Sequence, residues 1–152
     1  MAKERTMRVY EIEGPPVPWM RAGRVGEKYY DRQFKEKTRY QWTIKSGMSG
    51  LYAASGPIKL VVEFHMPIPK SWARKKRLEA VGKPHSVRPD FDNLMKFVGD
   101  ALNNLLWLDD AIIYCVSAMK FYQMEPKTRF LIIPHEGGTV EPLIKDNEKA
   151  YG

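Results

Sequence analysis

One amphipathic stretch near the middle of the chain, residues 88–110, constrains the fold most. Its apolar residues recur at the three- and four-residue spacing of a single helix face, which predicts a helix over about 91–105. Pro89 and the neighbouring Asp and Asn residues are typical of a helix start. The residues that form the apolar face are Phe91, Leu94, Met95, Val98, Ala101, Leu102, Leu105 and Leu106.

A line of charged residues lies off this apolar face. Asp92, Lys96 and Asp100 are spaced four residues apart and therefore share one side of the predicted helix. Asp109 and Asp110 follow shortly after the helix. Each carboxylate has an ordinary explanation by itself. An Asp in the first turn stabilises the helix dipole by about 0.3–1 kcal/mol, Asp92 and Lys96 suit a surface ion pair, and a double Asp suits a turn.

The overall charge of the chain makes these carboxylates unusual as a group. The sequence has 25 Lys and Arg against 18 Asp and Glu, yet residues 90–110 contain five Asp and one Lys. An acidic cluster within a basic protein needs a positive partner, and a hard metal cation is the simplest one. Mg²⁺ prefers carboxylate oxygens and water, and it usually keeps one or two protein carboxylates.

A long motif in this stretch resembles a known family. Asp-x-Asp-Asn-Leu-x-Lys, then Asp-Ala-Leu, then Trp-x-Asp-Asp, is similar to the RusA-like endodeoxyribonucleases, also called RusA-type Holliday junction resolvases. The similarity is close over residues 88–110 and loose elsewhere. It implies that the catalytic residues are Asp90, Asp92, Lys96 and Asp110, and that the metal ligands are Asp90, Asp92, Asp109 and Asp110.

The resemblance also implies an activity. A homodimer would cut Holliday (four-way) junctions during DNA recombination and repair, by phosphodiester hydrolysis that depends on Mg²⁺ or Mn²⁺, without a small-molecule cofactor. It is compatible with a phage or prophage origin. Two alternatives stay open: a nuclease of the same chemistry that acts on forks or flaps, and a non-catalytic junction-binding protein. The second alternative shares the basic charge but has no need of the acidic cluster.

Length and composition are those of one cytoplasmic domain. A chain of 152 residues, 43% apolar and 12% aromatic, is large enough to bury a core. The single cysteine, Cys115, excludes an internal disulfide and fits a reducing compartment. We expect no zinc site, signal peptide or membrane partner, because histidines are few and no apolar run approaches the ~18 residues of a membrane helix. The net charge of +7 favours a polyanionic partner such as branched DNA.

Two basic segments are candidates for DNA contact. The first follows the proline-rich residues 14–19, where arginines flank a glycine that lets backbone approach a ligand. The second is a charge run that leads directly into the aspartate motif. Such segments are also typical of a solvated face. The predicted DNA-binding residues are Arg21, Arg24, Lys70, Arg74, Lys75, Lys76, Arg77 and Arg88.

The remaining pattern predicts an α+β (mixed α/β) fold in a single domain, with a RusA-like sheet packed on helices in the order β-α-β-α-β-β. A second helix is predicted over 31–48, with Tyr29 and Tyr30 as exposed rings ahead of it. Residues 1–136 form the expected nuclease domain, and 137–152 a flexible C-terminal tail. The predicted strands are 7–13, 58–66, 111–122 and 129–133, and the last two are expected to form a hairpin.

The length of the predicted helix poses a geometric problem. A straight helix over 91–105 is ~22 Å long, with Asp90 and Asp92 at one end and Asp109 and Asp110 past the other. That is too far for one metal with ligands at ~2.0–2.1 Å. Either the helix breaks, near Gly99, or a second subunit completes each site. Two such helices packed antiparallel about a two-fold axis would give two composite sites per dimer.

Overall fold

A four-stranded mixed sheet organises the fold. The computed structural model describes residues 8–46, 52–103, 105–107, 109–135 and 139–142. Within the sheet, β5 is parallel to β6 and antiparallel to β7, and β1 is antiparallel to β7. The strand order is β1 (Arg8–Glu13), β7 (Lys127–Pro134), β5 (Ile58–Pro67) and β6 (Ile113–Gln123).

Period-two alternation gives each of the two central strands, β5 and β7, one buried face. In β5 every second side chain, from Ile58 to Met66, is buried, and in β7 Phe130 and Ile132 are buried on the same face. Successive strand residues point to opposite faces, so this pattern gives each strand one core face. Tyr40 of the neighbouring helix reaches this core, where its hydroxyl lies 3.1 Å from the Thr128 hydroxyl.

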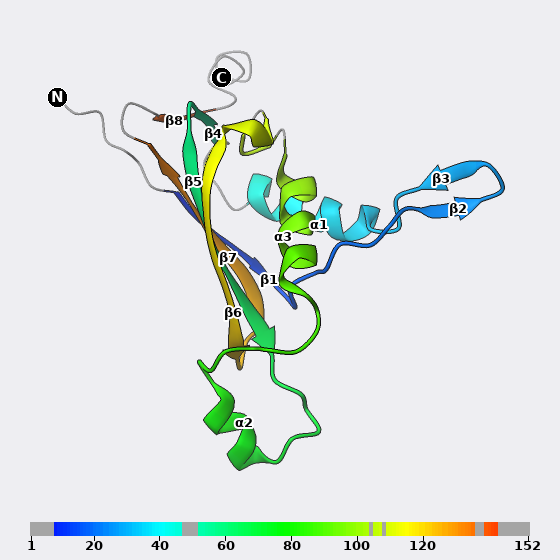
Figure 1. Cartoon of the computed structure of the whole chain (residues 1–152), viewed down its shortest axis with the longest axis vertical. Coiled ribbons are helices and arrows are strands. Elements are labelled where there is room, and N and C mark those ends of the chain that lie inside the picture. The colour runs from blue at the N-terminus through cyan, green and yellow to red at the C-terminus, as the bar shows by residue number, and fades with distance from the viewer. Residues whose placement is uncertain (1–7, 47–51, 104, 108, 136–138, 143–152) are drawn as a thin grey trace.

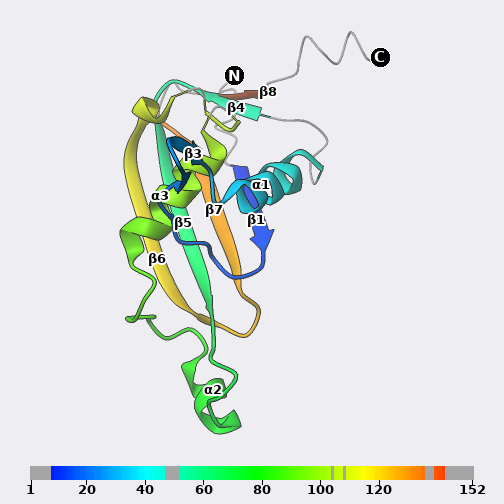
Figure 2. The ribbon, with the colours of Figure 1, turned by 90° about the vertical axis from the view of Figure 1, so that its right-hand side faces the viewer.

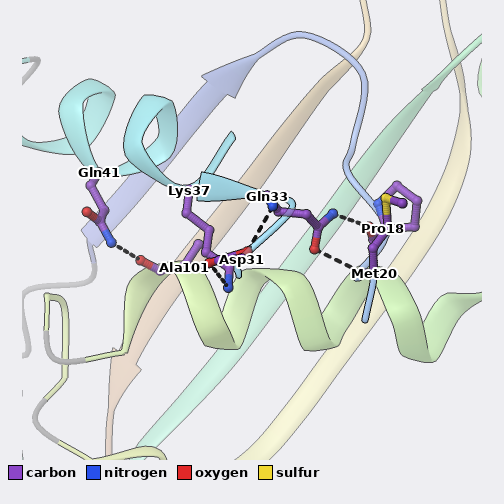
Figure 3. Close-up of polar contacts among 7 residues, drawn as sticks. All are labelled: Pro18, Met20, Asp31, Gln33, Lys37, Gln41 and Ala101. Atoms are coloured by element: carbon purple, nitrogen blue, oxygen red, sulfur yellow. Dashed lines mark hydrogen bonds and ion pairs between the residues drawn. The ribbon is translucent and has the colours of Figure 1, made fainter. Parts of the chain in front are cut away.

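Two helices, α1 (Phe34–Ser46) and α3 (Phe91–Leu102), cover the same face of the sheet (Figures 1 and 2). Gln41 Nε2 on α1 donates to the Ala101 carbonyl on α3 at 3.1 Å, which ties the two helices together (Figure 3). Leu94, Val98, Ala101 and Leu102 of the predicted apolar face are buried on α3, and Phe97 joins them in the core. Phe91, by contrast, is 39% exposed. The helix ends at Leu102 rather than at 105, so Leu105 and Leu106 are buried after it. No described helix covers the opposite face of the sheet. The α+β class is therefore as predicted.

The predicted hairpin of the last two strands is wrong. β6 and β7 follow each other in the chain, but β5 lies between them and pairs with both. Residues 124–126 join β6 to β7, and three residues at ~3.3–3.6 Å each can cross one intervening strand, since neighbouring strands lie ~4.7–4.9 Å apart. This order gives β5, whose alternating pattern is the cleanest, hydrogen-bond partners on both edges. A β6–β7 pair would leave one of those edges open.

Several elements were not predicted. β2 (Gly23–Val25) and β3 (Lys28–Tyr30) form a hairpin that projects from the body beside α1, and α2 (Arg74–Ala80) lies at one end of the sheet (Figure 1). β4 (Tyr52–Ser55) pairs with β8 (Thr139–Pro142), and a 3₁₀ turn, η1, spans Asp110–Ile112.

Element boundaries differ modestly from the prediction. The helix predicted over 31–48 spans Phe34–Ser46, and residues 47–48 lie outside the described residues. β8 falls inside the predicted tail, of which 143–152 are likewise outside the described residues. None of the described helices is long and apolar enough to cross a membrane.

Candidate active site

Asp90 and Asp92 lie at the N-terminus of α3, both exposed. Asp90 occupies the N-cap position, but its side chain makes no capping hydrogen bond. Asp92 Oδ1 accepts a 2.9 Å bond from the Asn93 backbone N–H. Within the described residues neither carboxylate forms an ion pair. Both line an open pocket of 850 Å³ that also includes Arg88 and Lys120. The Asp92–Lys96 ion pair that the spacing allows is therefore not formed.

Lys120 on β6 is a site residue that the sequence did not reveal. Its ammonium donates to the Val87 carbonyl at 2.6 Å and to the Pro89 carbonyl at 2.7 Å. These bonds hold the segment that leads into Asp90 against the sheet. A lysine in the alternating pattern of a strand gives no sequence signal for this role, because its partners lie on a distant loop.

Lys96 lies one helical turn after Asp92, where it contacts an aromatic ring. Its ammonium is 3.6 Å from the centroid of the Trp19 ring, which is a cation–π geometry. The Trp19 backbone N–H donates to the Asn93 carbonyl at 2.9 Å, so the backbone that carries the ring is fixed to α3 itself. Within the described residues Lys96 forms no ion pair with Asp100. The ring draws the ammonium toward itself, although Asp100 lies on the same side of the helix.

Asp110 lies beside the middle of α3, and the expectation that it lies past the helix end is wrong. The chain turns back after Leu102 because Leu105, Leu106 and Trp107 are buried in the core. The buried Trp107 indole N–H donates to Asp110 Oδ1, which fixes the carboxylate near α3. As a result, a pocket of 300 Å³ is lined by Lys96, Asp100 and Asp110 together with Met95 and Val116.

Asp109 has a clear local role. Its Oδ1 accepts a 2.9 Å hydrogen bond from the Ala111 backbone N–H and caps η1. This is the turn function that a double Asp before a strand suggests. One of its carboxylate oxygens is therefore already engaged, whereas the prediction that Asp109 also binds a metal stays a prediction.

The site residues thus fall into two groups along α3, with Asp110 contributed by η1. Asp90 and Asp92 share one pocket, and Lys96 and Asp110 share another. Across the described ranges, no three His, Cys, Asp or Glu side chains gather closely enough to hold a metal ion. Helix α3 continues unbroken through Gly99, which excludes the predicted break. The donor chemistry nevertheless suits Mg²⁺, because carboxylate oxygens are its preferred protein ligands.

The predicted DNA-binding residues lie in three places. Arg88 lines the Asp90 pocket, while Arg21 and Arg24 lie on or beside the β2–β3 hairpin. The third group lies on and before α2, where the ammonium of Lys76 is 4.0 Å from the Trp72 ring centroid. This third group comprises Lys70, Arg74, Lys75, Lys76 and Arg77.

Comparison with known families identifies the chain. The family model described as Endodeoxyribonuclease RusA matches residues 13–132, which include every strand of the four-stranded sheet at least in part. The chain belongs to the RusA endodeoxyribonuclease family. The predicted resemblance is thereby confirmed.

A curated relative extends the comparison. The chain is 34% identical over 82 residues to the uncharacterized protein YqaN of Bacillus subtilis (strain 168). The matched part is 51% of this chain and 58% of YqaN, so the chain spans little more than half the length of that relative.

Proposed function

We propose that this RusA family member is a structure-specific endonuclease that cuts four-way DNA junctions with the help of Mg²⁺ or Mn²⁺. The observation that carries the proposal is the position of Asp92 and Lys96 one turn apart on α3, with Asp110 fixed beside Lys96. The family supplies the activity class. The basic residues on α2 and near the β2–β3 hairpin would contact DNA phosphates, which position a substrate without reading its sequence.

Each residue has a defined chemical task in this proposal. Asp90, Asp92 and Asp110 would hold the divalent ion, and Asp109 would support its neighbour through the η1 cap. A bound divalent ion lowers the pKa of a water ligand and polarises the scissile phosphate. Lys96 carries its positive charge beside Asp110 in their shared pocket. There it would offset negative charge that develops on the phosphate in the transition state. No side-chain nucleophile is required.

A second subunit would complete each site. β6 is an edge strand of the sheet; its exposed Val116 lines the pocket of Lys96 and Asp110, and Tyr114 is exposed on the same strand. Exposed apolar side chains of this kind are typical of an interface. A second copy packed here about a two-fold axis would bring its Asp90 and Asp92 toward Asp110 of the first, as the isologous geometry of a C₂ dimer allows.

The first experiment tests the reaction. A synthetic four-way junction is incubated with wild type and with Asp92→Asn, in Mg²⁺ or with chelator. We expect paired, symmetrical nicks with wild type in Mg²⁺ only, and binding without cleavage by the variant. Equal junction binding by both proteins with no Mg²⁺-dependent cuts would support the non-catalytic alternative. Forks and flaps run in parallel would reveal a broader nuclease.

The second experiment tests whether the sites are composite. Asp92→Asn and Asp110→Asn are each inactive alone in this proposal. Co-expressed with different affinity tags and purified as a heterodimer, they would place both substitutions in one composite site and leave the other intact. We therefore expect single-strand nicking of the junction. If each site used residues of one protomer only, both sites would carry a substitution and the heterodimer would be inactive.

A further inference from the structure

A second, smaller pocket lies at the root of the β2–β3 hairpin, called here the arm (residues 21–30). It has a volume of 260 Å³, and its walls include the rings of Trp19, Tyr29 and Tyr30 together with Asp31 and Lys37. Three aromatic rings around one opening are unusual for a hydrated surface, because aromatic side chains are normally buried. The arm projects from the body of the molecule in Figure 1.

The root of the arm is held by a network of hydrogen bonds. The buried Gln33 side chain donates from Nε2 to the Pro18 carbonyl at 2.7 Å and accepts at Oε1 from the Met20 backbone N–H at 2.8 Å. Asp31 Oδ1 accepts from the Gln33 backbone N–H at 2.8 Å (Figure 3). The segments just before and just after the arm are thereby joined next to the pocket. The pocket is preformed, which lowers the entropic cost of filling it.

The tyrosines of the arm present their rings in different ways. Tyr29 is 70% exposed and Tyr30 is 50% exposed. The Tyr30 ring lies directly on Gly23, where a Cβ atom would come within 2.1 Å of the ring. Gly23 thus allows Tyr30 to lie flat across the arm and form one wall. Tyr29, by contrast, leaves most of its ring open to a planar partner.

The charges around the pocket suit DNA. The Arg24 guanidinium lies 5.5 Å from the Tyr29 ring centroid, and Arg21 and Lys28 are exposed nearby. The single carboxylate of the pocket, Asp31, accepts a 2.9 Å bond from the Lys37 ammonium, so its charge is compensated. This bond and the bond from the Gln33 backbone lower the pKa of Asp31, which keeps it an ionised acceptor for base N–H groups.

Trp19 connects this pocket to the proposed active site. The same ring that contributes to the pocket lies 3.6 Å from the Lys96 ammonium. A group held in the pocket would therefore lie close to any phosphate held at Lys96. In DNA, the group closest to a phosphate that is also planar and able to stack is the adjacent base.

We propose that the pocket of Trp19, Tyr29 and Tyr30 takes one unpaired nucleobase next to the scissile phosphate. The inference rests on the proposed function, because it names the part of the DNA substrate that the arm holds. A volume of 260 Å³ is below the ~300–1,000 Å³ of sites for larger ligands, as a single base requires. Aromatic rings bind bases by stacking, and a base that leaves a distorted duplex needs such a partner.

The test is a thermodynamic cycle between Tyr29 and one base, measured by junction binding without a divalent ion. Wild type and Tyr29→Ala are titrated against a four-way junction and against a series of junctions with one abasic site each, beside the mapped cleavage position. We expect Tyr29→Ala to weaken binding of the intact junction by about 5- to 150-fold, the range for losing one stacked base. This loss of affinity should disappear on only one junction of the series, the one that lacks the base bound by the pocket. Tyr29→Phe, which keeps the ring, should behave like wild type.

Trp42→Ala is the matched control, since Trp42 is 65% exposed on α1 and not among the residues that line this pocket. It should leave binding of every junction unchanged. A Tyr29→Ala penalty that is absent, or equal on all abasic junctions, would overturn the base-pocket inference while wild-type cleavage upholds the proposed function. If wild type neither binds nor cuts the junction, the proposed function fails and the inference fails with it.

Discussion

At the scale of single residues, the contact between Lys96 and Trp19 has the clearest chemical consequence. An aromatic face stabilises an ammonium ion but not a neutral amine. Trp19 therefore holds the Lys96 ammonium in a fixed place beside the pocket that it shares with Asp110. Because Trp19 is bonded through its backbone to α3, the ring and the lysine are positioned by the same element.

Replacing Trp19 should slow cleavage. The cation–π contact is worth about 0.5–2 kcal/mol, so Trp19→Leu should reduce the single-turnover rate at saturating protein by roughly 2- to 30-fold. Trp19→Phe should lose less, because it keeps a ring. In a Lys96→Ala background the Trp19→Leu substitution should have no further effect on the rate. An equal additional loss there would show that Trp19 does not act through Lys96.

At the scale of elements, α2 and the loop after it attach to β6 through His85. The ring of His85 is buried, with its centroid 4.8 Å from that of Tyr122, and its backbone N–H donates to the Lys120 carbonyl at 3.1 Å. Burial, and secondarily the nearby Lys120 charge, lower the pKa of His85 from its ordinary value of 6.5. The neutral imidazole is thus the form that packs here.

This lowered pKa predicts a pH dependence. Below about pH 6.5 the unfolded chain binds a proton at His85, whereas the folded chain does so only at lower pH. The free energy of unfolding is therefore highest above about pH 6.5 and falls as pH decreases toward the folded-state pKa. Denaturant midpoints at about pH 7.5 and about pH 5.5 measure the loss. His85→Gln should show a smaller loss between the two conditions than wild type. An identical pH dependence in both proteins would contradict the prediction.

The basic surface of α2 makes its own prediction. If Lys75 neutralises one DNA phosphate, Lys75→Gln should reduce the slope of log affinity against log salt by about 0.9. Lys45→Gln is the control, because Lys45 is an exposed lysine in the last turn of α1. It should leave the slope unchanged. Junction binding measured over a salt series gives both slopes. A Lys75→Gln slope equal to that of wild type would remove this residue from the DNA contact.

At the scale of the whole molecule, the two edges of the sheet have different expected roles. The edge strands are β1 and β6, and β6 carries exposed Val116 beside the Lys96 pocket. A sheet edge with exposed apolar groups is a ready site for association. In the proposed dimer, the pocket of Asp90 and Asp92 in one copy would meet the pocket of Lys96 and Asp110 in the other at this edge.

A charge at this edge should disrupt the pair. Val116→Glu should sediment as a monomer and lose at least tenfold of its junction cleavage, since two like charges would meet near a two-fold axis. Val9→Glu places the same charge on β1, where Val9 is 45% exposed, and should keep wild-type behaviour in both measurements. Circular dichroism checks that both variants are folded. A folded Val116→Glu dimer with full activity would place the interface elsewhere.

The sequence alone determined those features that arise from local periodicity and chemistry. The apolar face of α3, the alternation of β5 and the carboxylates suited to a hard cation depend on neighbours within a few residues, where backbone geometry is fixed. The β2–β3 arm escaped prediction because its strands are three residues long and mostly exposed, without an apolar alternation to reveal them.

The tertiary structure decided how distant segments meet. Three features depend on which side chains share the core: β5 lies between β6 and β7, Asp110 returns to the middle of α3, and the Lys96 ammonium contacts the Trp19 ring. Burial of Trp107 brings Asp110 to Lys96, and no local pattern encodes that burial. Such contacts follow from close packing of the whole chain, which a one-dimensional pattern does not contain.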